Sequence, residues 1–249
     1  MTAARPQLGC RILIGAVALI ILLGTNACGS DHPKRVYVFG DSLVSQATKY
    51  VKQQLRDDGF KASVASLSGT ATCDWFQNVA RARRQFHPDV VVMSFSGNAL
   101  GRCMLHADGS ALSGPEYEAK YRADTEKILA MFGVDVPVYL VGAPVSDTGD
   151  DRVFRIYEQI AKKHPNVRFV DGGKYLTPNH RFAMTLPCLR GEPCTGPVIR
   201  GARNNVVRAP DRAHFCPVAS APGAPCPVYS SGAYRFAIAI AQAVKQGQR

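Results

Sequence analysis

The stretch RVYVFGDSLV, residues 35–44, decides the predicted fold. An apolar run of β-branched and aromatic residues ends at Gly40 and Asp41, and a segment compatible with a helix begins close to Ser42, which predicts a strand followed directly by a helix. Ser42 would then lie at the carboxyl end of a strand, where α/β sheets open into a crevice. N–H groups at the start of the helix favour negative charge there. The position suits a nucleophile, although the same residues also suit a plain turn and helix cap.

Strand and helix patterns alternate along most of the chain. Residues 90–95 form an unbroken apolar run, which is typical of strands buried on both faces of a parallel sheet. The alternation predicts an α/β fold with a doubly wound, mainly parallel sheet. Strands are expected at 36–39, 62–67, 90–95, 136–141 and 167–170, and helices at 44–58, 74–86, 115–131, 152–163 and 231–246.

The segment 171–229 has no sustained period and holds nine of the sixteen prolines. A long irregular segment inside a compact domain is uncommon and tends to be functional or disordered. Four cysteines in this segment favour an ordered loop held by disulfides. The helix that follows, at 231–246, is expected to cover one face of the sheet.

The first residues resemble an export signal. Arg5 and Arg11 precede an apolar run at 12–23, and small or polar residues follow at 24–27. The apolar run is short for a membrane span. We therefore expect a signal peptide at 1–27, a short linker at 28–34 and a single domain at 35–249.

The residue after this signal is Cys28, which resembles the processing site of a bacterial lipoprotein. Thr25 and Asn26 depart from the usual residues of such sites, so plain secretion after cleavage at Ala27 is the alternative. The sequence predicts an extracytoplasmic protein, either anchored to the cell membrane through a lipid on Cys28 or secreted. We expect a monomer, which would meet the membrane surface through this lipid.

The chain has eight cysteines, and this number favours a lipid anchor on Cys28. Cys10 lies in the predicted signal, and if Cys28 is acylated, the six that remain can all pair. Disulfides fit an exported protein. No Cys-x-x-Cys spacing occurs and no cysteine clusters with histidines, so we expect neither a metal nor another cofactor. The sequence leaves the connectivity open, but closeness along the chain favours Cys188 with Cys194, Cys216 with Cys226, and Cys73 with Cys103.

The formal net charge is +11 at pH 7. A basic exported protein is attracted to anionic lipids or acidic wall polymers, but net charge gives only non-specific association. Aromatic residues are not interleaved with basic ones as in nucleic-acid-binding proteins, so we expect no nucleic-acid partner.

A serine hydroxyl needs a base, and one of the six histidines has an acid three residues before it. Asp211 precedes His214 at a spacing that can place a carboxylate beside the imidazole in a tight turn. Without Ser42, His214 would be read as an ordinary loop residue. Gly69 and Asn98 follow the second and third predicted strands and can supply donors to an oxyanion. Each alone is a turn residue, but with Ser42 they meet at one edge of the sheet.

These blocks resemble those of an SGNH hydrolase of the GDSL esterase/lipase superfamily. The matches are Gly40-Asp41-Ser42-Leu43, Ser68-Gly69, Gly97-Asn98 and Asp211 to His214, in the family's order and over most of the chain. The resemblance implies a flavodoxin-like, three-layer α/β/α fold. It also implies that Ser42 is the nucleophile, His214 the general base and acid, and Asp211 the residue that orients His214. The N–H groups of Ser42 and Gly69 and the side chain of Asn98 would form the oxyanion hole.

Two positions depart from the family pattern. Ala99 stands where members often have Asp, which would loosen the Asn98 loop unless a bond between Cys73 and Cys103 holds it. Phe215 stands where members often have Pro directly after the His.

The resemblance implies an esterase that removes short acyl groups from cell-envelope carbohydrate or lipid through an acyl-enzyme. An O-acyltransferase on the same fold and a non-catalytic envelope-binding lipoprotein stay open. An α/β-hydrolase is disfavoured because the Gly-x-Ser-x-Gly elbow is absent. The acyl chain and the alcohol are not named by the sequence.

Four arginines lie in the segment that leads to the predicted base His214. Guanidinium groups bind carboxylates and phosphates through paired donors, so we hypothesise an ester substrate on an anionic carrier. A solvated basic loop is the alternative. The residues are Arg200, Arg203, Arg208 and Arg212.

Overall fold

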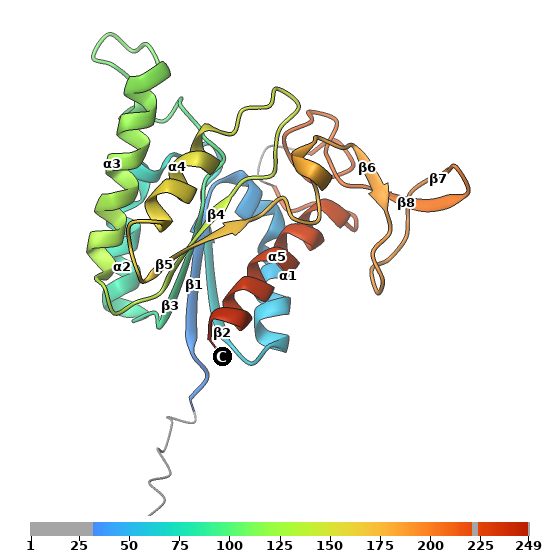
Figure 1. The fold of residues 1–249 in the computed structure, drawn as a ribbon, viewed down its shortest axis with the longest axis horizontal. Coiled ribbons are helices and arrows are strands. Elements are labelled where there is room, and N and C mark those ends of the chain that lie inside the picture. Colours follow the sequence, from blue (N-terminus) through green and yellow to red (C-terminus); the bar gives the residue numbers. More distant parts are fainter. Residues whose placement is uncertain (1–31, 221–223, 249) are drawn as a thin grey trace, which may run out of the picture. The chain divides into compact units, whose positions relative to one another are not determined.

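Within residues 32–220 and 224–248, which the computed structural model describes, five parallel strands form a sheet (Figure 1). Its strand order is β2-β1-β3-β4-β5. The predicted signal peptide 1–27 and Cys28 lie outside the described residues. The strands are β1 (Arg35–Gly40), β2 (Lys61–Ser66), β3 (Val90–Ser94), β4 (Val138–Gly142) and β5 (Val167–Asp171).

Five α-helices in the described part of the chain cover the two faces of this sheet. Figure 1 shows α1 and α5 on one face and α2, α3 and α4 on the other, so the predicted α/β/α layering is confirmed. Among the described residues, no helix combines the length and apolar character needed to cross a membrane. The helices are α1 (Ser42–Asp57), α2 (Phe76–Gln85), α3 (Gly114–Phe132), α4 (Arg152–Ala161) and α5 (Ser231–Gly247).

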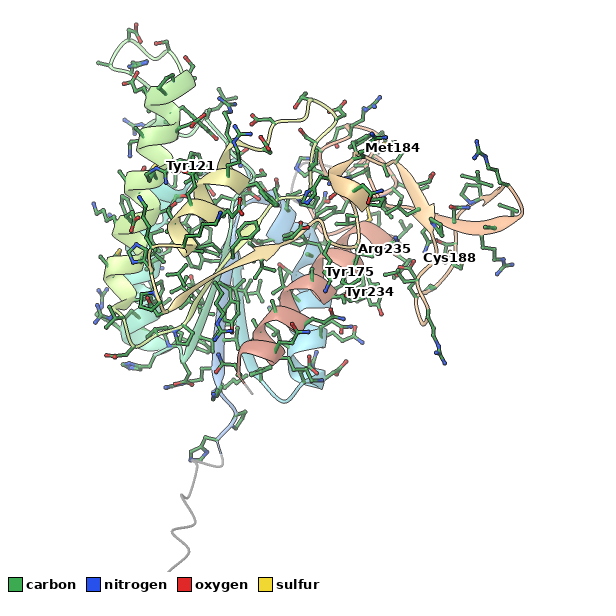
Figure 2. The ribbon with its side chains drawn as sticks, viewed as in Figure 1. Tyr121, Tyr175, Met184, Cys188, Tyr234 and Arg235 are labelled. Carbon is green, nitrogen blue, oxygen red and sulfur yellow. A yellow bond between two sulfur atoms is a disulfide. The ribbon has the colours of Figure 1, made fainter. Side chains whose placement is uncertain are left out.

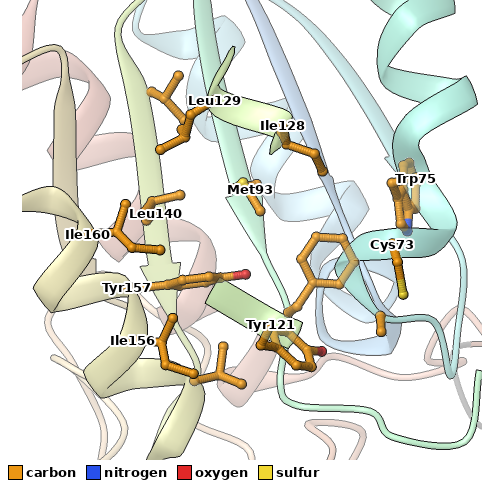
Figure 3. Close-up of a cluster of buried hydrophobic side chains, with 14 of the residues drawn as sticks. Cys73, Trp75, Met93, Tyr121, Ile128, Leu129, Leu140, Ile156, Tyr157 and Ile160 are labelled. Carbon is orange, nitrogen blue, oxygen red and sulfur yellow. The ribbon is translucent and has the colours of Figure 1, made fainter. Parts of the chain in front are cut away.

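The side chains of β1 explain why both layers are needed. Val36 and Val38 are buried in the core on the α1 and α5 side, whereas Tyr37 and Phe39 are buried in the core on the opposite side. Successive side chains of a strand point to opposite faces, so an unbroken apolar run requires cover on both. Figure 3 shows the second core, where residues of α3 and α4 pack on β3 and β4.

The end of β1 is crowded by its neighbours. A Cβ at Gly40 would lie 2.0 Å from the carbonyl oxygen of Ser94 and 2.6 Å from a methyl group of Val44, so only glycine fits. The connection from β1 leads to β2 on one side, and the next connection leads to β3 on the other. Such a switch point opens a crevice at the carboxyl ends of the strands. Ser42 begins α1 at this crevice.

The segment 171–229 is largely irregular, as predicted, but it also contains a small antiparallel sheet that the sequence did not reveal. Its strands are too short to show a period, and β8 is polar. Asn205 of β8 is buried, accepting a hydrogen bond from Thr195 N at 2.8 Å and donating one to Pro193 O at 2.8 Å. In β8, buried and hydrogen-bonded amide side chains therefore lie where an ordinary buried strand has apolar side chains. The strands are β6 (Thr185–Pro187), β7 (Val198–Ile199) and β8 (Ala202–Val206), in the order β6-β8-β7.

Within the part of the chain that the structure describes, three disulfides join the pairs that closeness along the chain favours. They link Cys73 with Cys103, Cys188 with Cys194 and Cys216 with Cys226. Stable disulfides are typical of oxidising compartments, which indicates an extracytoplasmic protein.

A buried ion pair fastens the small sheet to α5. Arg235 and Glu192 form a salt bridge with side chains only 2% and 0% exposed. Arg235 also donates to the carbonyl oxygens of Pro187 and Tyr175, so Tyr175, Cys188 and Arg235 gather at one end of α5 (Figure 2). Loss of one partner from such a pair leaves a buried charge uncompensated, so we infer that this contact fixes the loop around Cys188.

Candidate active site

Ser42 is the first residue of α1 and is 6% exposed. Asp41 is the N-cap, and its side chain accepts a hydrogen bond from Leu43 N at 3.1 Å. The first N–H groups of a helix have no partners inside the helix, and the helix dipole favours negative charge near them. Ser42 thus stands where a developing anion would be stabilised.

His214 and Asp211 complete a chain of hydrogen bonds to Ser42. His214 Nε2 lies 2.8 Å from Ser42 Oγ, and His214 Nδ1 lies 2.7 Å from Asp211 Oδ2. The other carboxylate oxygen of Asp211 accepts from the N–H groups of Ala213 and His214, both at 3.0 Å. The structure therefore brings together the three residues that the sequence singled out, although they are separated by up to 172 positions.

The ionisation of Asp211 suits this arrangement. Partial burial acts to raise its pKa, but the hydrogen bonds from the backbone and ring of His214 and from Ala213 outweigh burial, so the pKa lies below its usual value. A carboxylate that stays ionised can fix the imidazole tautomer and stabilise an imidazolium.

Gln46 holds the His214 loop on α1. Its Oε1 accepts hydrogen bonds from Phe215 N at 2.7 Å and from Cys216 N at 3.2 Å, and all three residues are buried. The Phe215 ring packs against Phe236 of α5 with centroids 5.2 Å apart. Phe215, where the family often has proline, thus anchors the loop through the core.

Two backbone N–H groups are available as oxyanion donors. Within the described residues, neither the N–H of Ser42 nor that of Gly69 has an acceptor. Gly69 has φ +75°, a left-handed conformation that favours glycine, and its loop is ordered by Trp75 Nε1 donating to Thr70 Oγ1 at 2.9 Å. The Cys73–Cys103 bond ties this loop to the one after Asn98.

The side-chain amide of Asn98 is already engaged in hydrogen bonds within the protein. Its Nδ2 donates to Asp41 Oδ2 at 3.0 Å and to Thr70 O at 3.1 Å, so both of its N–H groups have partners. Tyr117 Oη donates to Gly97 O at 2.9 Å, and Ala99 packs against the core. The Asn98 loop is therefore held firmly despite the missing aspartate at position 99.

Asp41 organises these loops and was missed as a functional residue. Its Oδ2 accepts from Ser96 N, Ser96 Oγ and Asn98 Nδ2 at 2.6, 2.7 and 3.0 Å. Burial raises the pKa of Asp41, while the hydrogen bonds from Ser96 and Leu43 oppose this shift without cancelling it. The sequence carried one signal for this role, which is that Asp41 directly precedes the candidate nucleophile. A helix N-cap at the end of a strand can reach residues that follow the adjacent strand.

The four arginines do not form one cluster. Arg208 is 1% exposed and donates to Val145 O at 3.0 Å, and burial lowers its pKa to about 10. Arg212 pairs with Asp147 at 2.8 Å. Arg200 and Arg203 are exposed on the β7–β8 hairpin. Arg208 therefore fits neither the hypothesised contact with an anionic carrier nor the alternative of a solvated loop, because its buried side chain supports the loop from inside.

Potential metal ligands come together at Cys73, Asp74 and Cys103. The two sulfur atoms are joined in a disulfide, so neither offers a thiolate. This cluster does not fit a metal ion.

A family model described as "Protein of unknown function (DUF459)" matches residues 35–218. The chain belongs to the DUF459 family. No curated protein sequence matches it. This DUF459 protein has the predicted parallel sheet, and Ser42, His214 and Asp211 from the quoted sequence blocks meet at its edge.

Solved structures share this fold at low sequence identity, which supports the fold alone. A lipase/acylhydrolase from Enterococcus faecalis is 16% identical, with a TM-score of 0.55 over 86% of this chain and 96% of that one. The catalytic domain of a peptidoglycan O-acetyltransferase from Streptococcus pneumoniae, which carries a methylsulfonyl adduct, is 16% identical, with a TM-score of 0.52 over 87% and 96%. A GDSL-like lipase from Bacteroides thetaiotaomicron is 15% identical, with a TM-score of 0.50 over 86% and 89%.

Proposed function

We propose that this DUF459 protein is a serine esterase that hydrolyses carboxylic esters through an acyl-enzyme. The observation that carries the proposal is the continuous hydrogen-bond chain from Ser42 through His214 to Asp211, at 2.8 and 2.7 Å. This order of hydroxyl, imidazole and carboxylate is the one by which serine hydrolases activate a nucleophile.

In the first half of the reaction, Ser42 Oγ attacks the ester carbonyl and His214 Nε2 takes its proton. The N–H groups of Ser42 and Gly69 stabilise the oxyanion, and Asn98 adds a third donor by sharing a hydrogen now given to Asp41 or Thr70. The carbon–oxygen bond to the alcohol then breaks, and His214 returns the proton to that oxygen. Asp211 stabilises the imidazolium throughout.

In the second half, water attacks the acyl-enzyme while His214 takes its proton. The bond to Ser42 Oγ breaks, Ser42 regains a proton from His214, and the carboxylic acid leaves. We place the substrate among short acyl esters of cell-envelope carbohydrate or lipid. A lipid on Cys28 would hold the enzyme at the membrane surface.

The test is turnover of p-nitrophenyl esters of increasing chain length together with labelling by a fluorophosphonate. Ser42→Ala should lower turnover at least about a thousandfold and abolish labelling while leaving the unfolding curve unchanged. Ser110→Ala, on a surface loop, is the matched control and should behave as wild type.

A folded wild-type protein that is neither labelled nor active would refute the proposal and favour an envelope-binding protein. Product analysis with an added saccharide separates the two fates of the acyl-enzyme. If the acyl group appears on the sugar in place of the free acid, the enzyme is an O-acyltransferase.

A further inference from the structure

A groove of about 740 Å³ runs beside α1, on the same helix as Ser42. Pockets that bind small ligands have volumes of roughly 300 to 1,000 Å³, so its size suits a ligand. We call it the lysine–tyrosine groove. It is lined mainly by residues of α1 and of the segments around Cys226 and Tyr234, among them Lys49, Lys52, Tyr50 and Tyr229.

We propose that the lysine–tyrosine groove binds an acidic oligosaccharide, which is the carrier of the ester cleaved at Ser42. This inference rests on the proposed esterase function and names the class of its substrate. It follows from the position, the aromatic wall and the charge of the groove.

The groove continues the helical stripe that begins at Ser42. Residues three, four, seven and eleven positions after Ser42 lie on the same side of α1, and these are Ser45, Gln46, Lys49 and Gln53. The helical rise makes the stretch from Ser45 to Gln53 about 12 Å long. A short oligosaccharide lying along it would end one helical turn from the nucleophile.

Three tyrosines form the aromatic wall. Tyr50, Tyr229 and Tyr234 contact one another with ring centroids 5.9 to 6.0 Å apart, and each is half-buried. Tyr50 Oη accepts from Ser230 N at 3.1 Å, and Tyr229 Oη donates to Glu192 at 3.3 Å. Because these two hydroxyls are engaged within the protein, their rings offer mainly apolar surface, which suits the C–H faces of sugar rings.

The charge of the groove is positive only. Lys49 and Lys52 are exposed, and no Asp or Glu is among the lining residues. Neither ammonium group pairs with a carboxylate in the described part of the chain, and Lys49 Nζ lies 6.0 Å from the Tyr50 ring centroid. Unpaired lysines beside an aromatic surface, with the Gln53 and Gln54 amides nearby, suit a sugar ring that carries a carboxylate.

A covalent link joins this groove to the catalytic loop. Cys226 lines the groove, and its disulfide partner Cys216 lies two residues after His214. Gln46, which also lines the groove, accepts hydrogen bonds from the residues that follow His214. The wall that would hold the carrier is therefore attached to the loop that carries the base.

The experiment measures binding without turnover. Titration calorimetry on Ser42→Ala uses an oligogalacturonate and its fully methyl-esterified form, which differs only by its lost charges. We expect the acidic form to bind at least tenfold more tightly at low ionic strength, with the difference shrinking at high salt. Replacing both Lys49 and Lys52 by Gln should weaken binding of the acidic form about tenfold, since each exposed ion pair contributes modestly.

Two further variants sharpen the result. Tyr234→Ala should weaken the binding of both oligosaccharides equally, because it removes ring surface and no charge. Lys174→Gln is the matched control, since Lys174 Nζ lies 5.3 Å from the centroid of the Tyr175 ring but outside the groove. Added to Ser42→Ala, it should leave the affinity for both oligosaccharides unchanged. Unchanged unfolding curves show that the variants are folded.

Equal affinity for the two oligosaccharides, no binding of either, or no effect of the Lys49 and Lys52 replacements would overturn the proposal. Sedimentation with phosphatidylglycerol vesicles that depends on the two lysines, without oligosaccharide binding, would also overturn it in favour of a lipid surface. Because binding is measured on an inactive variant, these outcomes are independent of whether wild type turns over p-nitrophenyl esters.

Discussion

Replacement of Gln46 by Met tests whether the base is held in place from α1. Met has a similar length and no strong acceptor, so packing changes little while the N–H groups of Phe215 and Cys216 lose their partner. Each buried donor left unsatisfied costs about 1 to 3 kcal/mol. Partial relaxation of the loop offsets some of this, so we expect the free energy of unfolding to fall by about 3 kcal/mol.

The same change should lower activity, because the two N–H groups belong to the residues directly after His214. A looser loop populates the Ser42–His214 hydrogen bond less often, so kcat for p-nitrophenyl acetate should fall about tenfold or more with little change in KM. Urea unfolding and steady-state kinetics measure the two effects.

The matched control is Gln77→Met on α2, where the side chain is exposed and has no hydrogen bond in the described structure. It should leave both quantities within error of wild type. If Gln46→Met unfolds within about 1 kcal/mol of wild type and keeps its kcat, Gln46 does not position the base.

Two other predictions concern the loop that carries His214. The pKa of Asp211 lies below its usual value of about 3.9, so its stabilising contribution is complete above that value and is lost as the pH falls through the lower, folded-state pKa. Asp211→Asn should flatten the dependence of unfolding free energy on pH in this acid range, and urea titrations that show the same slope as wild type would contradict this. Replacing Cys216 and Cys226 together by Ser should lower the unfolding free energy by about 2 to 4 kcal/mol, as measured by urea unfolding, and an unchanged value would mean that the bond adds no stability.

The sequence predicted the central sheet because β1, β3 and β4 are largely apolar runs, which can be recognised as strands from neighbouring residues alone. It also predicted Ser42, Asp211 and His214, since each lies in a short block with recognisable chemistry. Gln46 could not be found in this way. A glutamine in an amphipathic helix has no local signal, and its role depends on N–H groups 169 and 170 positions later.

The hypothesis that the four arginines bind an anionic carrier misjudged Arg208 for a related reason. A guanidinium in a basic loop is expected at the surface, but Arg208 is buried where carbonyl groups of Val145 and Ala213 accept its hydrogen bonds. The strands β6–β8 were missed because they are short and because β8 carries the buried, hydrogen-bonded amides of Asn204 and Asn205. In both cases, hydrogen bonds inside the fold satisfied polar groups that local sequence places in solvent.

The distance along the chain between Ser42 and His214 has a consequence for the order of events during folding. Ser42 lies near the beginning of the domain and His214 lies 172 residues later, while α1 packs on α5, the last helix that the structure describes. Contacts between distant segments close late, since the intervening chain must first be ordered. A chain in which α5 has not yet packed leaves the apolar side of α1 uncovered. Under the proposed function, the esterase therefore becomes active only after α5 has docked on α1.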